Sequence, residues 1–152
     1  MPTQLPSDEP SADLHGKVLY IEDVDINYTV VEAILARHAG VQVLRASSGA
    51  EGIERVRSTS PDFVLLDMHL PDMSGLEVVR ELSTIIAERQ LRVTILTGDR
   101  LTMDIIKAMS LGAYEYMVKP VDAKALEAGV RRALTGKQAD PSSTLGTLNT
   151  QH

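Results

Sequence analysis

Apolar positions along the chain follow two patterns that alternate. Short, nearly continuous runs rich in Val, Ile and Leu are typical of strands buried on both faces of a parallel sheet. Between these runs, apolar residues recur at helical spacing among polar ones. The runs predict strands at residues 17–21, 41–46, 63–66, 92–96 and 114–118. Two polar interruptions in the second run are typical of an edge strand.

Capping signals mark where three of the intervening helices begin. Ser48-x-x-Glu51 and Ser74-x-x-Glu77 are capping boxes, in which a hydroxyl accepts a hydrogen bond from a free backbone N–H of the first turn. Asp122 is suited to the same role before the last helix. Helices are therefore predicted directly after each of these residues.

Apolar stripes predict which face each helix buries. The first helix is predicted from Ile26 to a basic last turn at 37–38, with Gly40 just past its end. The fourth is predicted from about residue 101 and stops at Gly112. The residues expected to face the core are Ile26, Val30, Ala33 and Ile34 in the first helix, Ile53 and Val56 in the second, Leu76, Val79, Leu82 and Ile86 in the third, Met103, Ile106 and Met109 in the fourth, and Leu126, Val130 and Leu134 in the fifth.

Alternation of five strands with five helices indicates repeated right-handed βαβ units. We therefore predict an α/β fold, a doubly wound five-stranded parallel sheet with helices on both faces. Residues 16–136 are predicted to form its single domain. Residues 1–15, with three prolines and little apolar periodicity, are predicted to be a flexible N-terminal arm. The polar residues 137–152 are predicted to be a flexible C-terminal tail.

Composition and charge exclude several classes of protein. A net charge of −6, no Trp and a single Phe leave neither a basic footprint nor a stacking platform for nucleic acid. No apolar run is long enough to span a membrane, and the first residues lack the basic start and apolar core of a signal peptide. We expect a cytoplasmic protein without membrane contact. The absence of cysteine excludes disulfides and thiolate chemistry.

Chemically active side chains stand where the predicted strands end. Glu22 and Asp23 follow the first strand, Asp67 the third, Thr97 the fourth and Lys119 the fifth. The carboxyl ends of parallel strands share one edge of the sheet, and ligands bind at that edge. An isolated Asp at a strand end is usually a turn former. Here, however, five groups are predicted to converge.

The converging groups favour phosphoryl chemistry at a carboxylate. Three acids in one crevice repel one another, and a single lysine does not balance them. An all-oxygen set of ligands suits a hard divalent cation such as Mg²⁺. Metal and lysine together neutralise the oxygens of a phosphoryl group during transfer. Thr97 adds a hydroxyl for such an oxygen, and Gly98 leaves the approach open.

This constellation, together with Pro71 and Gly75 downstream of Asp67 and Pro120 after Lys119, resembles the receiver domain of two-component response regulators over residues 17–135. The resemblance implies a flavodoxin-like sheet with strand order 2-1-3-4-5. It also implies that Asp67 is the nucleophile that accepts the phosphoryl group. The remaining roles that it implies are Mg²⁺ binding by Glu22, Asp23, Asp67 and the backbone carbonyl of His69, and sensing of the phosphorylated state by Thr97, Lys119 and Tyr116.

The chain departs from the family pattern at two positions. Glu22 replaces the commoner Asp, which lengthens the reach to the metal, and Val121 stands where many receivers have Phe. The His69 imidazole is an alternative ligand or phosphoryl acceptor, although a loop histidine is usually only solvated. Asp72 is interpreted as a turn residue.

Three functions fit these observations. The first is a single-domain response regulator, phosphorylated by a histidine kinase or histidine phosphotransfer protein and acting through an unknown downstream protein. Homodimerisation through helix 4, strand 5 and helix 5 is left open, and no enzyme activity on a separate substrate is expected. The second is a receiver segment of a hybrid histidine kinase, against which Met1 favours a complete chain. The third is a small Mg²⁺-dependent phosphohydrolase, but such enzymes place a second acid where this chain has His69.

Overall fold

A computed structural model describes residues 14–98 and 100–136 of the chain. The predicted flexible arm, apart from its last two residues, and the predicted tail lie outside these described residues. The elements are β1 (His15–Ile21), α1 (Asp25–Leu35), β2 (Gly40–Ala46), α2 (Gly49–Thr59), β3 (Phe63–Leu66), α3 (Gly75–Arg89), β4 (Arg92–Thr97), α4 (Met103–Ser110), β5 (Glu115–Val118) and α5 (Ala123–Gly136).

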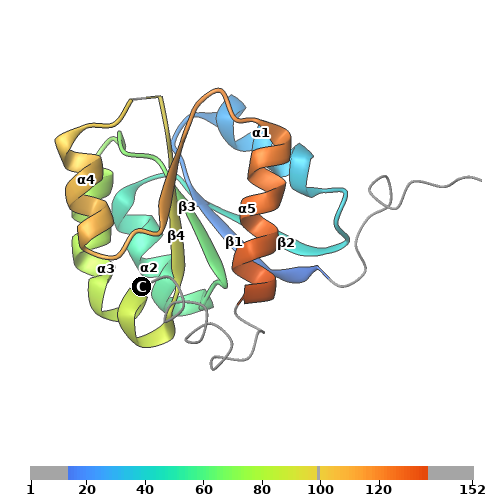
Figure 1. Ribbon diagram of the computed structural model, residues 1–152, viewed down its shortest axis with the longest axis horizontal. Coiled ribbons are helices and arrows are strands. Elements are labelled where there is room, and N and C mark those ends of the chain that lie inside the picture. The colour runs from blue at the N-terminus through green and yellow to red at the C-terminus, as the bar shows by residue number, and fades with distance from the viewer. Residues whose placement is uncertain (1–13, 99, 137–152) are drawn as a thin grey trace, which may run out of the picture.

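The five strands form one parallel sheet in the order β2-β1-β3-β4-β5, which confirms the predicted fold class and the edge position of β2 (Figure 1). Ile21, Leu66 and Ile95 stand side by side on the three central strands. The strands therefore end almost level with one another. The residues that follow Ile21 and Leu66 in the chain therefore lie at the same edge of the sheet.

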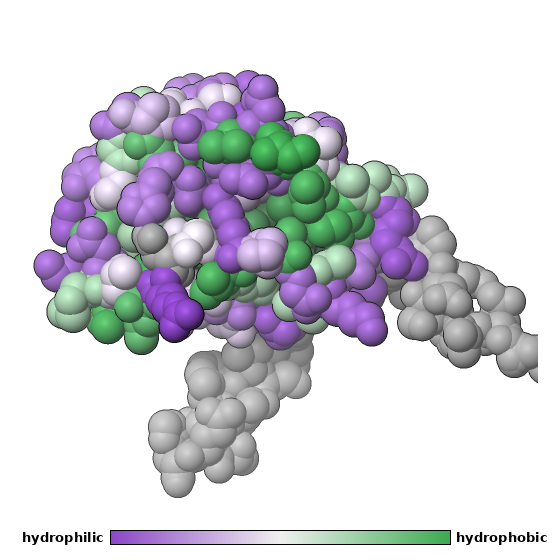
Figure 2. All heavy atoms as spheres, turned by 90° about the horizontal axis from the view of Figure 1, so that it is seen from above, coloured by the Kyte–Doolittle hydropathy of each residue, from purple (hydrophilic) through white to green (hydrophobic). Residues whose placement is uncertain are grey.

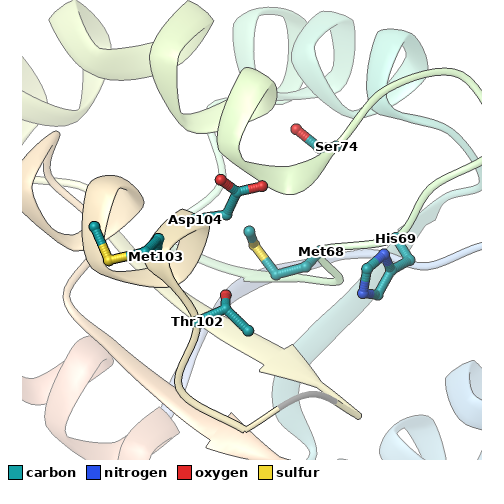
Figure 3. Close-up of a pocket in the computed structure, with 6 residues that line it drawn as sticks. All are labelled: Met68, His69, Ser74, Thr102, Met103 and Asp104. Carbon is teal, nitrogen blue, oxygen red and sulfur yellow. The ribbon is translucent and has the colours of Figure 1, made fainter.

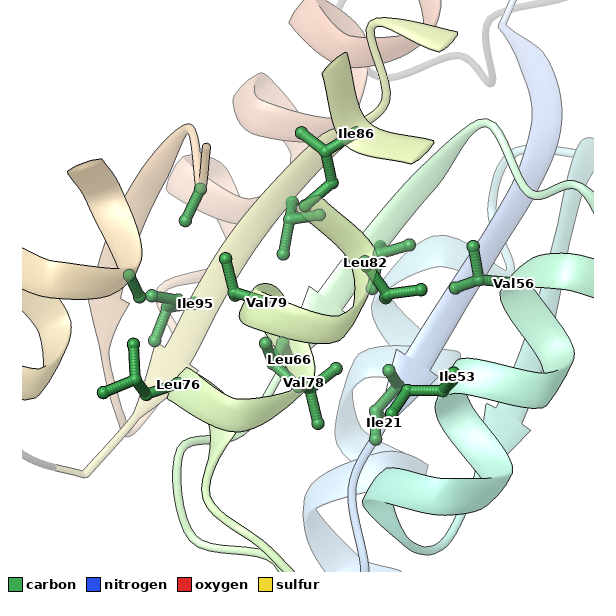
Figure 4. Packing of buried hydrophobic residues seen from close by; sticks show 14 of the residues in the cluster. Ile21, Ile53, Val56, Leu66, Leu76, Val78, Val79, Leu82, Ile86 and Ile95 are labelled. Atoms are coloured by element: carbon green, nitrogen blue, oxygen red, sulfur yellow. The ribbon is translucent and has the colours of Figure 1, made fainter. Parts of the chain in front are cut away.

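Two hydrophobic clusters fill the two faces of the sheet. Val64 and Leu66 of β3 point into the cluster covered by α2, α3 and α4, which Figure 4 shows, while Phe63 and Leu65 point into the cluster covered by α1 and α5. The period of two along a strand explains this division. Burial of one such side chain contributes about 1.5–3 kcal/mol, so the central strand anchors both layers.

Capping occurs where the sequence predicts it. The Ser48 and Ser74 hydroxyls accept the backbone N–H of Glu51 and Glu77, at 3.1 Å and 3.2 Å. Asp122 accepts the N–H of Ala125 at 3.1 Å, before α5.

The predicted buried stripe of α1 is wrong in part, although Ile34 does pack against the cluster under α1 and α5. Ile26 is 64% exposed and Val30 is also exposed, whereas Val31 and Leu35 are buried. Apolar residues cover more than one side of this helix, so its pattern alone does not select a face, and packing on β1 and α5 decides. The helix also ends at Leu35, earlier than predicted, and Gly40 is the first residue of β2.

The predicted stripe of α4 is wrong in part for the same reason, although Met109 does pack against the cluster under α2, α3 and α4. Ile105 and Ala108 are buried, while Met103 is 65% exposed and Ile106 is exposed too. Apolar residues lie on more than one side of this short helix, and Asp104, Lys107 and Ser110 are its polar residues. Its outer side therefore exposes apolar side chains. With neighbouring exposed residues, the set consists of Leu101, Met103, Ile106, Leu111, Tyr114 and Val118. We call this set the α4–β5 patch.

Leu14 and His15, assigned to the flexible arm by the sequence, belong to the fold. Leu14 is buried in the cluster under α1 and α5, and His15 is the first residue of β1. Within the described part of the chain, no helix is long and apolar enough to cross a membrane.

Candidate functional site

The acidic residues predicted at the strand ends do come together. One carboxylate oxygen each from Glu22, Asp23 and Asp67 lies within 4.8 Å of the others. Glu22 and Asp67 are buried, whereas Asp23 is exposed and opens the group to solvent. Oxygen ligands alone, with one open side for retained water, fit a hard divalent cation. The arrangement therefore matches the predicted type of metal site.

Lys119 lies between two of these carboxylates. Its Nζ donates to Glu22 Oε1 at 2.7 Å and is 3.5 Å from Asp67 Oδ1. The side chain enters from the end of β5, whose last residue, Val118, pairs with Thr97 on β4. Pairing of the parallel strands thus places the Lys119 ammonium next to Glu22, which follows β1, and Asp67, which follows β3.

The two buried carboxyl groups respond differently to this environment. Burial raises the pKa of Asp67, and the charge of Glu22 raises it further, against opposing effects of Lys119 and the backbone N–H of His69. Burial also acts to raise the pKa of Glu22, but hydrogen bonds from Lys119, Val24 and Tyr20 outweigh it, so the pKa of Glu22 lies below its ordinary value. The charge of Glu22 is therefore stabilised by its hydrogen-bond donors. The charge of Asp67 is not fully stabilised, and a bound cation would stabilise it.

The loop after Asp67 is held in a tight conformation. The N–H of Gly75 donates to the Met68 carbonyl at 2.8 Å, and a Cβ at Gly75 would stand 2.8 Å from the Asp67 carbonyl oxygen. Only glycine allows the chain to approach so closely. His69 donates its N–H to Asp67, while its side chain is exposed. Its imidazole is not among the clustered ligand atoms.

Asp72, interpreted from sequence as a turn residue, has a longer-range role. Its two carboxylate oxygens accept the N–H groups of Gly49 and Ala50 at 2.8 Å and 2.9 Å, so the loop after β3 is fastened to the N-terminus of α2. Hydrogen bonds from the Ala50 and Gly49 N–H groups lower the pKa of Asp72. No local pattern shows this contact, because the partners are more than 20 residues apart.

We expect Asp72→Asn to lower the melting temperature at neutral pH, because a neutral amide is a poorer partner for a helix N-terminus. The folded pKa of Asp72 lies below its ordinary value of 3.8. Its stabilisation is therefore present above that value and lost as the pH falls through the lower folded pKa. Thermal unfolding from neutral to acid pH should show a difference between wild type and variant that shrinks below about pH 4.

The matched control is Asp104→Asn, which alters an acid in the first turn of α4. It should give a smaller difference in melting temperature than Asp72→Asn. An Asp72→Asn difference that stays constant down to acid pH would contradict the role given to this carboxylate.

The predicted sensing residues occupy different depths. Thr97 is buried at the end of β4, and a Cβ added at the following Gly98 would meet no atom within 4 Å, so the approach there is open. Tyr116 pairs with Ile95, further inside the sheet, and packs in part against the cluster under α3 and α4. Val121, which replaces the common Phe, packs against the cluster under α1 and α5.

A cavity of about 340 Å³ lies between the loop after β3 and the start of α4. Met68, His69 and Ser74 line it from the loop after β3, and the start of α4 lines the other side (Figure 3). Figure 2 views the whole molecule from above, and on the face seen there polar side chains are mixed with apolar areas. None of the three clustered acids lines this cavity, although Met68 directly follows Asp67 in the chain.

Comparison with known proteins assigns the fold and site to a family. The family model for the response regulator receiver domain matches residues 18–131 of the sequence, which is most of the chain. The chain belongs to this family. The resemblance inferred from the strand-end residues is confirmed.

Relatives of different sizes share this domain. The transcriptional regulatory protein AfsQ1 of Streptomyces coelicolor is 34% identical over 86% of this chain and 57% of its own length. The protein PilH of Pseudomonas aeruginosa is 30% identical over 80% of this chain and 99% of its own length. The chain therefore spans little more than half of the first relative and nearly all of the second.

Solved structures show the same fold. A response regulator receiver domain protein from Clostridium thermocellum is 35% identical, with a TM-score of 0.71 over 80% of this chain and 96% of that one. A CheY-like receiver domain protein from Methanospirillum hungatei has a TM-score of 0.72 at 22% identity, over 82% of this chain and 97% of that one.

Proposed function

We propose that the protein accepts a phosphoryl group on Asp67 from a histidine kinase or histidine phosphotransfer protein and signals by phosphorylation-dependent binding of a partner. The observation that carries the proposal is the setting of Asp67. It is a buried carboxylate with raised pKa, it is clustered with Glu22 and Asp23, and the Lys119 ammonium lies between it and Glu22. A nearby cation would stabilise the charge of such a carboxylate. The Lys119 ammonium could stabilise the charge of a phosphoryl group transferred to it.

Mg²⁺ is the proposed cofactor, held by Glu22, Asp23, Asp67 and the backbone carbonyl of His69. The clustered oxygens and the excess charge on Asp67 support this choice. When bound, the ion neutralises charge on the oxygens of the phosphoryl group in transfer. Few protein ligands and one open side favour weak, reversible binding.

In the transfer, an Asp67 carboxylate oxygen attacks the phosphorus of a phosphohistidine on the partner. The new O–P bond forms as the P–N bond breaks, and the electron pair of that bond stays on the departing imidazole. Lys119 moves from the carboxylates to a phosphoryl oxygen, and the Thr97 hydroxyl donates to another. Water later cleaves the O–P bond. The chain thus acts only on its own phosphoryl group.

The proposed output is a change at Tyr116, the α4–β5 patch and α5. Movement of Thr97 toward a phosphoryl oxygen leaves space that Tyr116, on the neighbouring strand, is large enough to use. The uncovered apolar side chains of the α4–β5 patch give a partner or a second copy of the chain a surface to bind. The response can be no larger than the partner's preference for one of the two states.

Amide NMR spectra with and without beryllofluoride, a mimic of the phosphoryl group, test this function in the presence of Mg²⁺. We expect shifts around Asp67, Thr97 and Lys119 that extend to Tyr116 and α5. Shifts confined to the loop after β3 would place the output surface elsewhere. Unchanged spectra would contradict phosphoryl acceptance at Asp67.

The same site would serve a receiver that acts alone or one within a hybrid histidine kinase. The match to PilH over almost its whole length supports the first, which we propose together with a cytoplasmic location. "DNA-binding" describes the relative MtrA of Mycolicibacterium smegmatis, and the net charge of −6 gives no support for direct nucleic-acid binding here. A phosphohydrolase is disfavoured, because the position that would carry its second acid is His69.

A further inference from the structure

Tyr20 contacts the acidic group from within the core. It is the residue before the last in β1 and is fully buried, and its hydroxyl donates to Glu22 Oε1 at 2.9 Å. The same oxygen accepts the Lys119 ammonium at 2.7 Å, while Oε2 accepts the Val24 N–H at 3.1 Å. Glu22 is itself fully buried. Two donors therefore share one carboxylate oxygen that water does not reach.

Phosphorylation of Asp67 would change the hydrogen bonds that Glu22 Oε1 accepts. Lys119 is closer to Glu22 than to Asp67, at 2.7 Å against 3.5 Å. To reach a phosphoryl oxygen on Asp67, the ammonium has to give up at least part of its bond to Glu22. The proposed Mg²⁺ would still compensate the charge of Glu22, but the buried Oε1 loses one of its two hydrogen bonds, which destabilises it. A second donor that stays on Oε1 lowers the cost of releasing the lysine.

We propose that Tyr20 is a positioning residue for phosphoryl transfer, whose hydroxyl keeps the buried Glu22 carboxylate hydrogen bonded while Lys119 moves to a phosphoryl oxygen on Asp67. This inference rests on the proposed function. It assigns no proton transfer to Tyr20, which stays a donor throughout. Burial, followed by the charge of Glu22, raises the pKa of Tyr20 and keeps the phenol protonated.

The surroundings of Tyr20 hold its hydroxyl in place. Its ring stacks on that of Tyr28 of α1, with centroids 6.2 Å apart and planes at 30°. The guanidinium of Arg45 lies 5.1 Å from the centre of the Tyr28 ring, and its Nε donates to the Glu22 carbonyl at 3.1 Å. A fixed phenol cannot follow the lysine. It therefore remains with Glu22 when Lys119 leaves.

Tyr20→Phe tests the proposal, because it removes the hydroxyl and keeps the ring. Tyr28→Phe is the matched control, since the Tyr28 hydroxyl reaches the Val43 carbonyl at 3.4 Å and not Glu22. Beryllofluoride affinity is measured by NMR titration of the full chain at saturating Mg²⁺. The side-chain resonances of Lys119 are followed in the same titration. Thermal unfolding without ligand reports whether each variant is folded.

We expect Tyr20→Phe to bind beryllofluoride about tenfold more weakly, with a smaller shift of the Lys119 resonances, because the bond to Glu22 is lost in both states but its loss costs more once Lys119 has left the same oxygen. Tyr28→Phe should match the wild type in both. A general loss of stability would leave the Lys119 shift of the bound form unchanged. Equal affinity of Tyr20→Phe and wild type, or equal weakening in both variants, would overturn the proposal. A wild type that binds no beryllofluoride would contradict the proposed function itself.

Discussion

Asp67→Asn is expected to abolish phosphorylation of the protein by acetyl phosphate in the presence of Mg²⁺. The amide is a poor nucleophile and removes one of the three acidic ligands, so both the attacking atom and part of the metal site are lost. Intact-mass spectra recorded over time should show one phosphoryl group added to the wild type and none to the variant. The added group should be released by hydroxylamine, which cleaves acyl phosphates.

Asp62→Asn is the control for this change, because it alters a carboxylate just before the opposite end of the same strand, where Asp62 accepts the Lys17 N–H at 2.8 Å. It should leave phosphorylation unchanged. Equal phosphorylation of the wild type and Asp67→Asn would show that the phosphoryl group goes elsewhere.

Removal of the metal should have the second largest effect. A chelator, or Asp23→Ala, is expected to slow phosphorylation by roughly a hundredfold, the usual effect of losing one electrostatic stabiliser of a transition state. Asp23 is the exposed member of the acidic group, so its loss opens no cavity in the core. Calorimetric titration with Mg²⁺ and initial phosphorylation rates measure the two consequences separately.

Asp25→Ala serves as the control for Asp23→Ala. Asp25 is an exposed acid two residues further on that pairs with Arg45 at 2.9 Å and lies outside the acidic group. It should retain Mg²⁺ binding and phosphorylation. A phosphorylation rate that is insensitive to the chelator would contradict the role given to the metal.

The sequence predicted the sheet well because buried parallel strands have a strong signature. The run Phe63-Val64-Leu65-Leu66 has nothing polar to place on a solvent face, and both faces of β3 are indeed covered. Helices α1 and α4 were harder, since apolar residues surround more of each helix than one face can bury. Ile26 and Met103 remain exposed because only the packing on the sheet selects the buried side.

The candidate site could be predicted in part from the positions of its residues at the strand ends. Glu22, Asp67 and Lys119 follow strand ends, and parallel pairing brings those ends together wherever the strands are correctly placed. Tyr20 lies inside the apolar run 17–21, which predicts only that it belongs to a strand. Its spacing of two from Glu22, which puts both side chains on one face of β1, was the available signal. The contact of Asp72 with α2 had no such signal.

Mapping the phosphorylated residue tests the central claim most directly. The wild-type chain is phosphorylated with acetyl phosphate and Mg²⁺, the acyl phosphate is trapped by hydride reduction, and the reduced residue is located by tandem mass spectrometry. The account predicts that the reduced residue is Asp67. Reduction at another acid, or a phosphoryl group retained on His69, would contradict it.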